Sequence, residues 1–159
     1  MIRWLFMQLS EIFLGLGEEP FRDLLRGISI GKLKTYQLYD RVKVRLHLAK
    51  LNSENLGKSE PRFWARLAEK DDEFATDLAQ AILVSHLDMI KAVLDELGIP
   101  NQEGFFEKDI DGAKYLTSGW EQRVYEKFKT VYPPAVLLFY INHLGWEIGK
   151  AEQVYQVAG

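Results

Sequence analysis

Residues 135–149 read AVLLFYINHLGWEIG, and Pro133 and Pro134 stand immediately before them. A helix through this stretch carries apolar side chains on every face, which is typical of a helix buried at the centre of a domain. The stretch is too short to span a bilayer, which requires about 20 apolar residues. It therefore predicts an all-α fold in which other helices cover a central apolar helix.

Signals for further helices lie before this central stretch. Asp71 or Asp72 caps a helix that runs to residue 97, where Gly98 and Pro100 end it. Shorter helices are predicted within residues 1–17, 20–26, 30–51, 62–70 and 119–132. The sequence thus predicts one domain over residues 1–159, built as a bundle of six or seven helices.

Two sets of apolar residues complete the predicted packing. We expect the first set, on the helices at 72–97 and 135–149, to be nearly buried, and it consists of Leu78, Ile82, Ile90, Val93, Leu137, Leu144 and Trp146. The second set lies in residues 101–119, the longest weakly periodic stretch. We expect its members to pin this stretch to the body of the domain, and they are Phe105, Phe106, Tyr115 and Leu116.

Composition and cysteine content exclude several classes of protein. The chain has 159 residues, of which 47% are hydrophobic and 27% are charged, as is ordinary for a globular domain. Because it contains no cysteine, it has no disulfide scaffold, thiolate zinc site, iron–sulfur cluster or cysteine nucleophile. No segment has the composition of a membrane span or a leader sequence, so we expect no membrane association and a cytoplasmic location.

Charged residues are unevenly distributed along the chain. Residues 22–50 contain eight basic and two acidic side chains, a net of +6, whereas residues 69–111 contain twelve acidic and three basic ones, a net of −9. Two solvated faces of opposite sign are the simplest interpretation. Alternatively, the basic segment binds an acidic partner, including the acidic half of a second copy. Nucleic-acid binding through residues 32–50, which contain Tyr36 and Tyr39, is disfavoured by the overall net charge of −3.

Two histidines form the most distinctive polar feature. His86 lies on the apolar side of its predicted helix, and His143 stands four residues before Glu147, so both imidazoles are expected to face inward. One hypothesis is that His86, His143 and Glu147 bind a divalent metal, as carboxylates and imidazoles do within helical bundles. The interpretation that we favour is structural, with each histidine buried and hydrogen-bonded to a carbonyl or to Ser85, Asn142 or Glu147.

Together these features favour a non-catalytic module that binds another protein or a second copy of itself. We expect a homodimer, with Trp4, Leu5 and Phe13 of the first helix in or near the contact. Enzymatic activity stays open, and the alternative function is a metal-dependent enzyme or sensor built on the histidine site. No cofactor is expected, apart from a divalent metal under that alternative.

Overall fold

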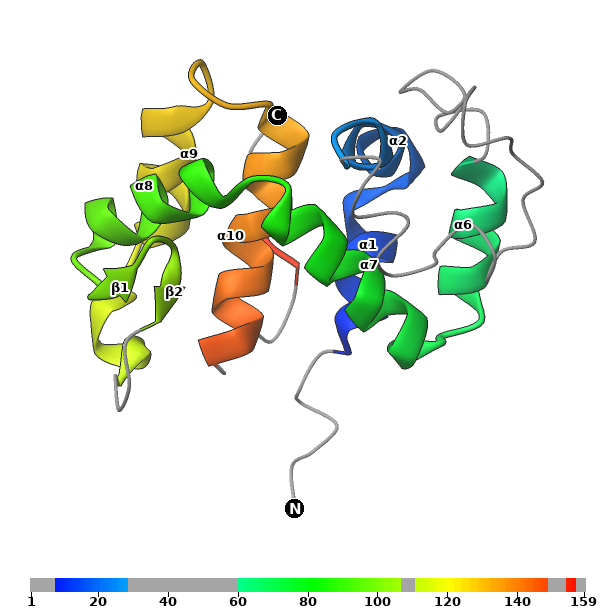
Figure 1. The fold of residues 1–159 in the computed structure, drawn as a ribbon, viewed down its shortest axis with the longest axis horizontal. Coiled ribbons are helices and arrows are strands. Elements are labelled where there is room, and N and C mark those ends of the chain that lie inside the picture. Colours follow the sequence, from blue (N-terminus) through cyan, green and yellow to red (C-terminus); the bar gives the residue numbers. More distant parts are fainter. Residues whose placement is uncertain (1–7, 29–59, 107–110, 149–153, 157–159) are drawn as a thin grey trace. The chain divides into compact units, whose positions relative to one another are not determined.

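The computed structural model describes residues 8–28, 60–106, 111–148 and 154–156 (Figure 1). Within these ranges the chain forms seven α-helices, one short 3-10 helix and one small hairpin, which confirms the predicted all-α fold. The described residues divide into two compact units, which we call the N-terminal unit (8–85) and the C-terminal unit (from His86 onward). That the whole chain is one domain stays a prediction. The predicted helix at 30–51 lies outside the described residues.

Four helices of the N-terminal unit lie within the described residues. They are α1 (Leu9–Leu16), α2 (Glu18–Arg26), α6 (Glu60–Ala68) and α7 (Asp72–Val84). Helix α1 contacts the other three, so it lies at the centre of this unit. The part of the predicted first helix that precedes Gln8 is not among the described residues.

Aromatic side chains dominate the core of the N-terminal unit. The rings of Phe13 and Phe21 meet edge to face with centroids 5.7 Å apart, and those of Phe63 and Phe74 lie 6.0 Å apart. All four side chains are fully buried. The expectation that Phe13 takes part in a dimer contact is therefore wrong, because α2, α6 and α7 leave α1 no free apolar face at this residue.

The C-terminal unit contains the remaining elements. They are α8 (Leu87–Leu97), β1 (Asn101–Gln102), β2 (Phe105–Phe106), the 3-10 helix η3 (Gly112–Tyr115), α9 (Trp120–Phe128) and α10 (Pro134–Ile148). Helix α9 packs against both α8 and α10. Every residue from 139 to 145 of α10 is buried, so protein covers this helix on all sides, as its apolar sequence predicts.

The predicted core is confirmed at six of its seven positions. Leu78, Ile82, Ile90, Val93, Leu137 and Leu144 are all buried. Trp146 is only half-buried, which corrects the expectation for this residue. Its position near the end of α10 explains the difference, because fewer neighbours surround the last turn of a helix than its middle.

The predicted helix from 72 to 97 is in fact two helices, which is a further correction. The hydroxyl of Ser85 donates to the carbonyl of Ala81 at 2.7 Å, while the Ser85 N–H turns to the carbonyl of Ile82. The side chain thus takes the acceptor that a continuous helix would give to the backbone N–H. His86 then leaves the helical region, with φ −135° and ψ 41°, and its carbonyl starts α8 by accepting from the Ile90 N–H.

None of the helices that the structure describes combines the length and the apolar composition needed to cross a membrane.

Candidate functional site

The structure places the three predicted metal ligands at the start of α8 and near the end of α10. His86 is the N-cap residue of α8, and His143 and Glu147 lie one turn apart on α10. His143 is buried, whereas Glu147 is exposed. Among the described residues, no three His, Asp or Glu side chains are grouped so that they could hold a metal ion. The triad of His86, His143 and Glu147 therefore gains no support and stays a prediction.

His143 sits in an aromatic environment. It is only 3% exposed, and its ring centroid lies 5.9 Å from that of Phe139 and 5.4 Å from that of Trp146. Burial lowers the pKa of His143 from 6.5 to about 4, because the charged imidazolium cannot be solvated there. The imidazole is consequently neutral at physiological pH.

The hydrogen bond that the structural interpretation requires is missing at one atom of this ring. The Nδ1 atom of His143 is buried and has no hydrogen-bond partner within the described part of the chain. Packing between the two aromatic rings, rather than a fixed polar contact at Nδ1, accounts for the burial of His143. Glu147 does not bond to this Nδ1 atom. Glu147 is exposed as a residue, but nearby atoms partly bury its carboxyl group and raise the pKa of that group.

The neighbouring residue Asn142 makes the polar contacts that His143 lacks. Its Nδ2 atom donates to the carbonyls of Leu138 at 3.0 Å and Tyr155 at 3.2 Å, and its Oδ1 atom accepts from the Tyr155 N–H at 2.6 Å. Asn142 is 3% exposed. Its hydrogen bonds join α10 to a residue 13 positions further along the chain. A polar residue inside an apolar helix was the available sequence signal, but its partner was not predictable.

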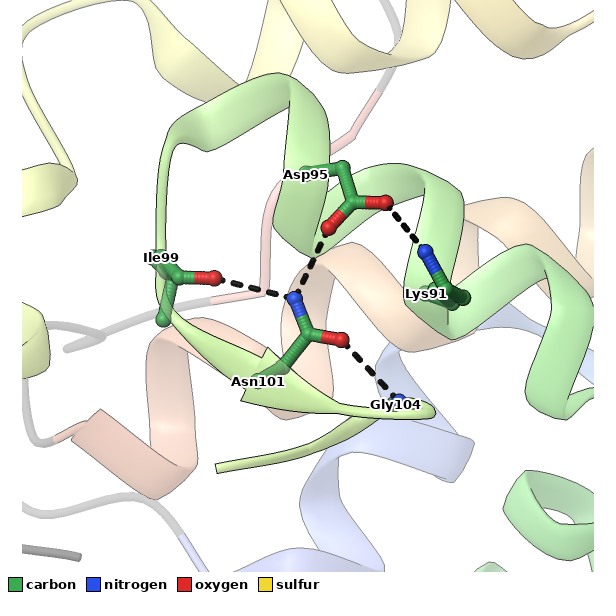
Figure 2. A network of polar contacts seen from close by, with 5 residues as sticks. All are labelled: Lys91, Asp95, Ile99, Asn101 and Gly104. Carbon is green, nitrogen blue, oxygen red and sulfur yellow. Dashed lines mark hydrogen bonds and ion pairs between the residues drawn. The ribbon is translucent and has the colours of Figure 1, made fainter. Parts of the chain in front are cut away.

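A second polar cluster supports the hairpin that follows α8 (Figure 2). The Nδ2 atom of Asn101 donates to Asp95 at 2.9 Å and to the carbonyl of Ile99 at 3.0 Å. Its Oδ1 atom accepts from the Gly104 N–H at 3.1 Å. Asp95 in turn pairs with Lys91 at 2.8 Å. One amide thus connects the last turns of α8 to both sides of the hairpin turn.

The backbone at both ends of this cluster is fixed as well. Gly98 ends α8 with a left-handed φ of 79°, and the Ile99 N–H bonds back to the carbonyl of Leu94, as in a Schellman motif. The hairpin turn has positive φ at Glu103 (53°) and Gly104 (94°), and Gln102 pairs with Phe105 across it. Two positive φ values in a two-residue loop define a type I′ turn, whose twist matches that of paired strands.

This hairpin corrects the expectation for residues 101–119. Leu116 is buried as expected, and Tyr115 is half-buried. Phe105 and Phe106, however, are 56% and 37% exposed, so strand β2 presents two aromatic rings at the surface instead of pinning the segment. The sequence did not predict this, because Glu-Gly is a weaker turn signal than Asn-Gly or Asp-Gly.

The other proposed binding segments lie outside the described residues. These are the basic segment at 32–50 and the residues Trp4 and Leu5. Nucleic-acid binding and a dimer contact at Trp4 and Leu5 accordingly stay predictions. Comparison with known protein families, with curated proteins and with solved structures finds no match for this chain.

Proposed function

We propose that this protein is a non-catalytic helical binding module that associates with a second copy of itself through the Phe105–Phe106 hairpin. One observation carries the proposal: two neighbouring phenylalanines are exposed on a strand whose backbone is held rigidly by Asn101. A cytoplasmic location completes the proposal, since a chain without cysteine suits a compartment that does not form disulfides.

The distribution of exposed apolar residues supports the hairpin as the contact. Among the described residues only three large hydrophobic side chains are exposed, namely Phe105, Phe106 and Val131, and two of them are adjacent on β2. Because successive side chains of a strand point to opposite faces, the two rings lie on the two sides of one hairpin. Exposed aromatic residues on a preorganised element are typical of binding surfaces. Rigid backbone geometry lowers the entropy cost of binding, because the hairpin does not have to become ordered.

Two features favour a second copy as the partner. A twofold arrangement lets the same hairpin serve both sides of the contact, so that each chain contributes its strand β2. The sequence also holds a basic segment of net +6 and an acidic segment of net −9, and opposite charges of this kind attract one another between two copies.

The size of the patch implies weak association. Four half-exposed phenylalanines contribute on the order of 3–6 kcal/mol when they are buried. This corresponds to a dissociation constant of about 0.1 mM or weaker, before other contacts are added. The protein should therefore be a monomer when dilute and a dimer at high concentration.

Sedimentation velocity over a concentration series tests this proposal. The wild-type chain should begin to change from monomer to dimer as the concentration approaches about 1 mM, which lies within the expected range of dissociation constants of about 0.1 to several millimolar. The double variant Phe105→Ser/Phe106→Ser should stay monomeric while keeping its helical circular dichroism. Val131→Ser, which removes an exposed apolar side chain elsewhere in the C-terminal unit, is the matched control and should dimerise like the wild type.

Two outcomes would contradict the proposal. One is a wild-type chain that stays monomeric throughout the series. The other is a double variant that dimerises as strongly as Val131→Ser, since the contact would then lie elsewhere. A wild-type monomer that instead binds another protein through Phe105 and Phe106 would keep the binding module but remove the second copy as its partner.

A further inference from the structure

Asn142 and Tyr155 form an unusual pair. The Oδ1 atom of Asn142 accepts from the N–H of Tyr155 at 2.6 Å, and its Nδ2 atom donates to the carbonyl of the same residue at 3.2 Å. One buried side chain thus binds both polar backbone groups of one residue. In Figure 1 the segment that contains Tyr155 (residues 154–156, red) runs beside α10.

This geometry is that of a strand pair in which a side chain replaces one strand. The N–H and C=O of a single residue point to the same side only when its backbone is close to extended, as at a hydrogen-bonded position of an antiparallel ladder. The amide of Asn carries one acceptor and one donor group in the matching arrangement. Asn142 therefore recognises an extended main chain, and this contact does not depend on the identity of the bound residue.

Helix α9 contributes the surroundings of the bound side chain. Tyr155 is half-buried, and burial together with the carboxylates Glu121 and Glu126 raises the pKa of its hydroxyl. Both glutamates belong to α9, and α9 packs against α10. The main chain of the occupant is thus bound from α10, and its hydroxyl lies within electrostatic reach of the α9 carboxylates.

We propose that Asn142 and the adjoining part of α9 form a receptor for an extended peptide, occupied here by the chain's own Tyr155 segment, and that this receptor also accepts the Tyr155 segment of a second copy. Asn142 is 3% exposed with the segment in place, and loss of the segment would remove two of the three hydrogen bonds of its amide, leaving only the bond to the Leu138 carbonyl. An extended segment restores these two bonds, and such a segment is present both in the same chain and in a second copy.

Competition between the two sources determines how the receptor must be tested. A segment on the same chain has an effective concentration of roughly millimolar, so a free peptide competes poorly with it. The peptide binds well only when the chain's own segment can no longer use the site. Tyr155→Pro produces this state in the full chain, because proline has no backbone N–H to donate to the Oδ1 atom of Asn142.

The experiment is fluorescence anisotropy with a labelled peptide of residues 151–159, AEQVYQVAG. The peptide should bind the full-length Tyr155→Pro variant saturably, and the wild-type chain at least tenfold more weakly. Adding Asn142→Leu to Tyr155→Pro should abolish binding, because leucine fills the space without the amide. The same peptide with proline at the Tyr155 position should not bind, whereas phenylalanine there should bind within a few-fold of tyrosine.

Several results would overturn the receptor. They are a failure of the peptide to bind Tyr155→Pro, equal binding to the Asn142→Leu double variant, or equal binding of a scrambled peptide. The Phe105→Ser/Phe106→Ser changes, made in the Tyr155→Pro background, should leave peptide binding unchanged. The receptor and the hairpin contact thus succeed or fail separately.

A second measurement covers the case in which Tyr155→Pro does not fold. Millimolar peptide added to the ¹⁵N-labelled wild-type chain should displace the chain's own segment and move the amide signal of Tyr155. The proline-containing peptide should leave that signal in place. A Tyr155 signal that does not respond to millimolar peptide would contradict the proposal.

Discussion

Asn101 and Gly104 are joined by a hydrogen bond of 3.1 Å between the side-chain Oδ1 of the first and the backbone N–H of the second. The bond spans a turn in which Gly104 has a φ of 94°, and a Cβ atom there would lie 3.3 Å from the carbonyl oxygen of Leu87. The turn is thus held from one side by an amide and pressed from the other against the first turn of α8. The exposed phenylalanines of β2 follow directly after it.

Replacing Gly104 by alanine should be more destabilising than the same change at Gly98. Both glycines have a left-handed φ, so each substitution costs about 1 kcal/mol of backbone strain. A Cβ at Gly98 meets nothing within 4 Å, whereas one at Gly104 also meets Leu87 and Ile90. We expect a total of about 2–3 kcal/mol for Gly104→Ala. Urea unfolding of both variants measures the difference, and equal losses would show that α8 does not press on the turn.

The stability of the fold should decrease as the pH falls from 6.5 toward 4, because His143 is buried as the neutral form. Its pKa is about 4 in the folded chain and near 6.5 when unfolded, so the unfolded state binds more protons within this window. The stabilisation is complete above pH 6.5 and up to about 3 kcal/mol is lost by pH 4. Urea unfolding at several pH values, compared with His143→Gln, isolates this contribution. An identical pH dependence in the two proteins would argue against a buried neutral His143.

Protein purified without a histidine tag should contain no stoichiometric divalent metal. The expectation follows from the positions of the predicted ligands, since Glu147 is exposed while His143 is buried between aromatic rings. Elemental analysis, together with melting curves with and without a chelator, checks it, and the chelator should leave the melting temperature unchanged. Stoichiometric zinc, manganese or iron that disappears in His143→Ala would instead establish the metal site.

Leu144→Ala should reduce the free energy of unfolding by about 2–5 kcal/mol. Leu144 is completely buried within α10, so the shorter side chain loses its transfer free energy and leaves a cavity. Leu138→Ala is the matched control, because it makes the same change on the same helix at a partly exposed position and should cost less. Chemical denaturation gives both values. Equal and small losses would show that α10 is not the centre of the core.

Features that depend on neighbouring residues were predictable. The side chain of Asp71 accepts from the Phe74 N–H at 3.0 Å and begins α7, as a capping aspartate should. Gly98 ends α8 in the left-handed conformation, and α10 begins at Pro134, the second residue of a proline pair. Each signal acts through contacts a few residues apart, so the amino-acid order alone contains the information.

The break between α7 and α8 marks the limit of this local reasoning. Apolar residues continue at helical spacing through Ser85 and His86, so the pattern favoured one long helix. The hydroxyl of Ser85 can bond to the carbonyl of Ala81 in an intact helix or in a broken one, and local sequence does not distinguish the two. Only the structure shows the broken form, in which the Ser85 N–H bonds to the carbonyl of Ile82 instead of that of Ala81.

The amino-acid sequence was sufficient for the helical class, the burial of α10 and most helix ends, because these follow from short-range hydrogen bonds and from apolar periodicity. It was not sufficient for the burial of Phe13, the exposure of Phe105 or the pairing of Asn142 with Tyr155. An apolar ring is equally suited to a core and to a contact surface, and an amide can pair with any backbone within reach. Whether a ring is buried and which backbone an amide binds depend on the segments that folding brings together. These segments lie far apart along the chain, so patterns of neighbouring residues do not reveal them.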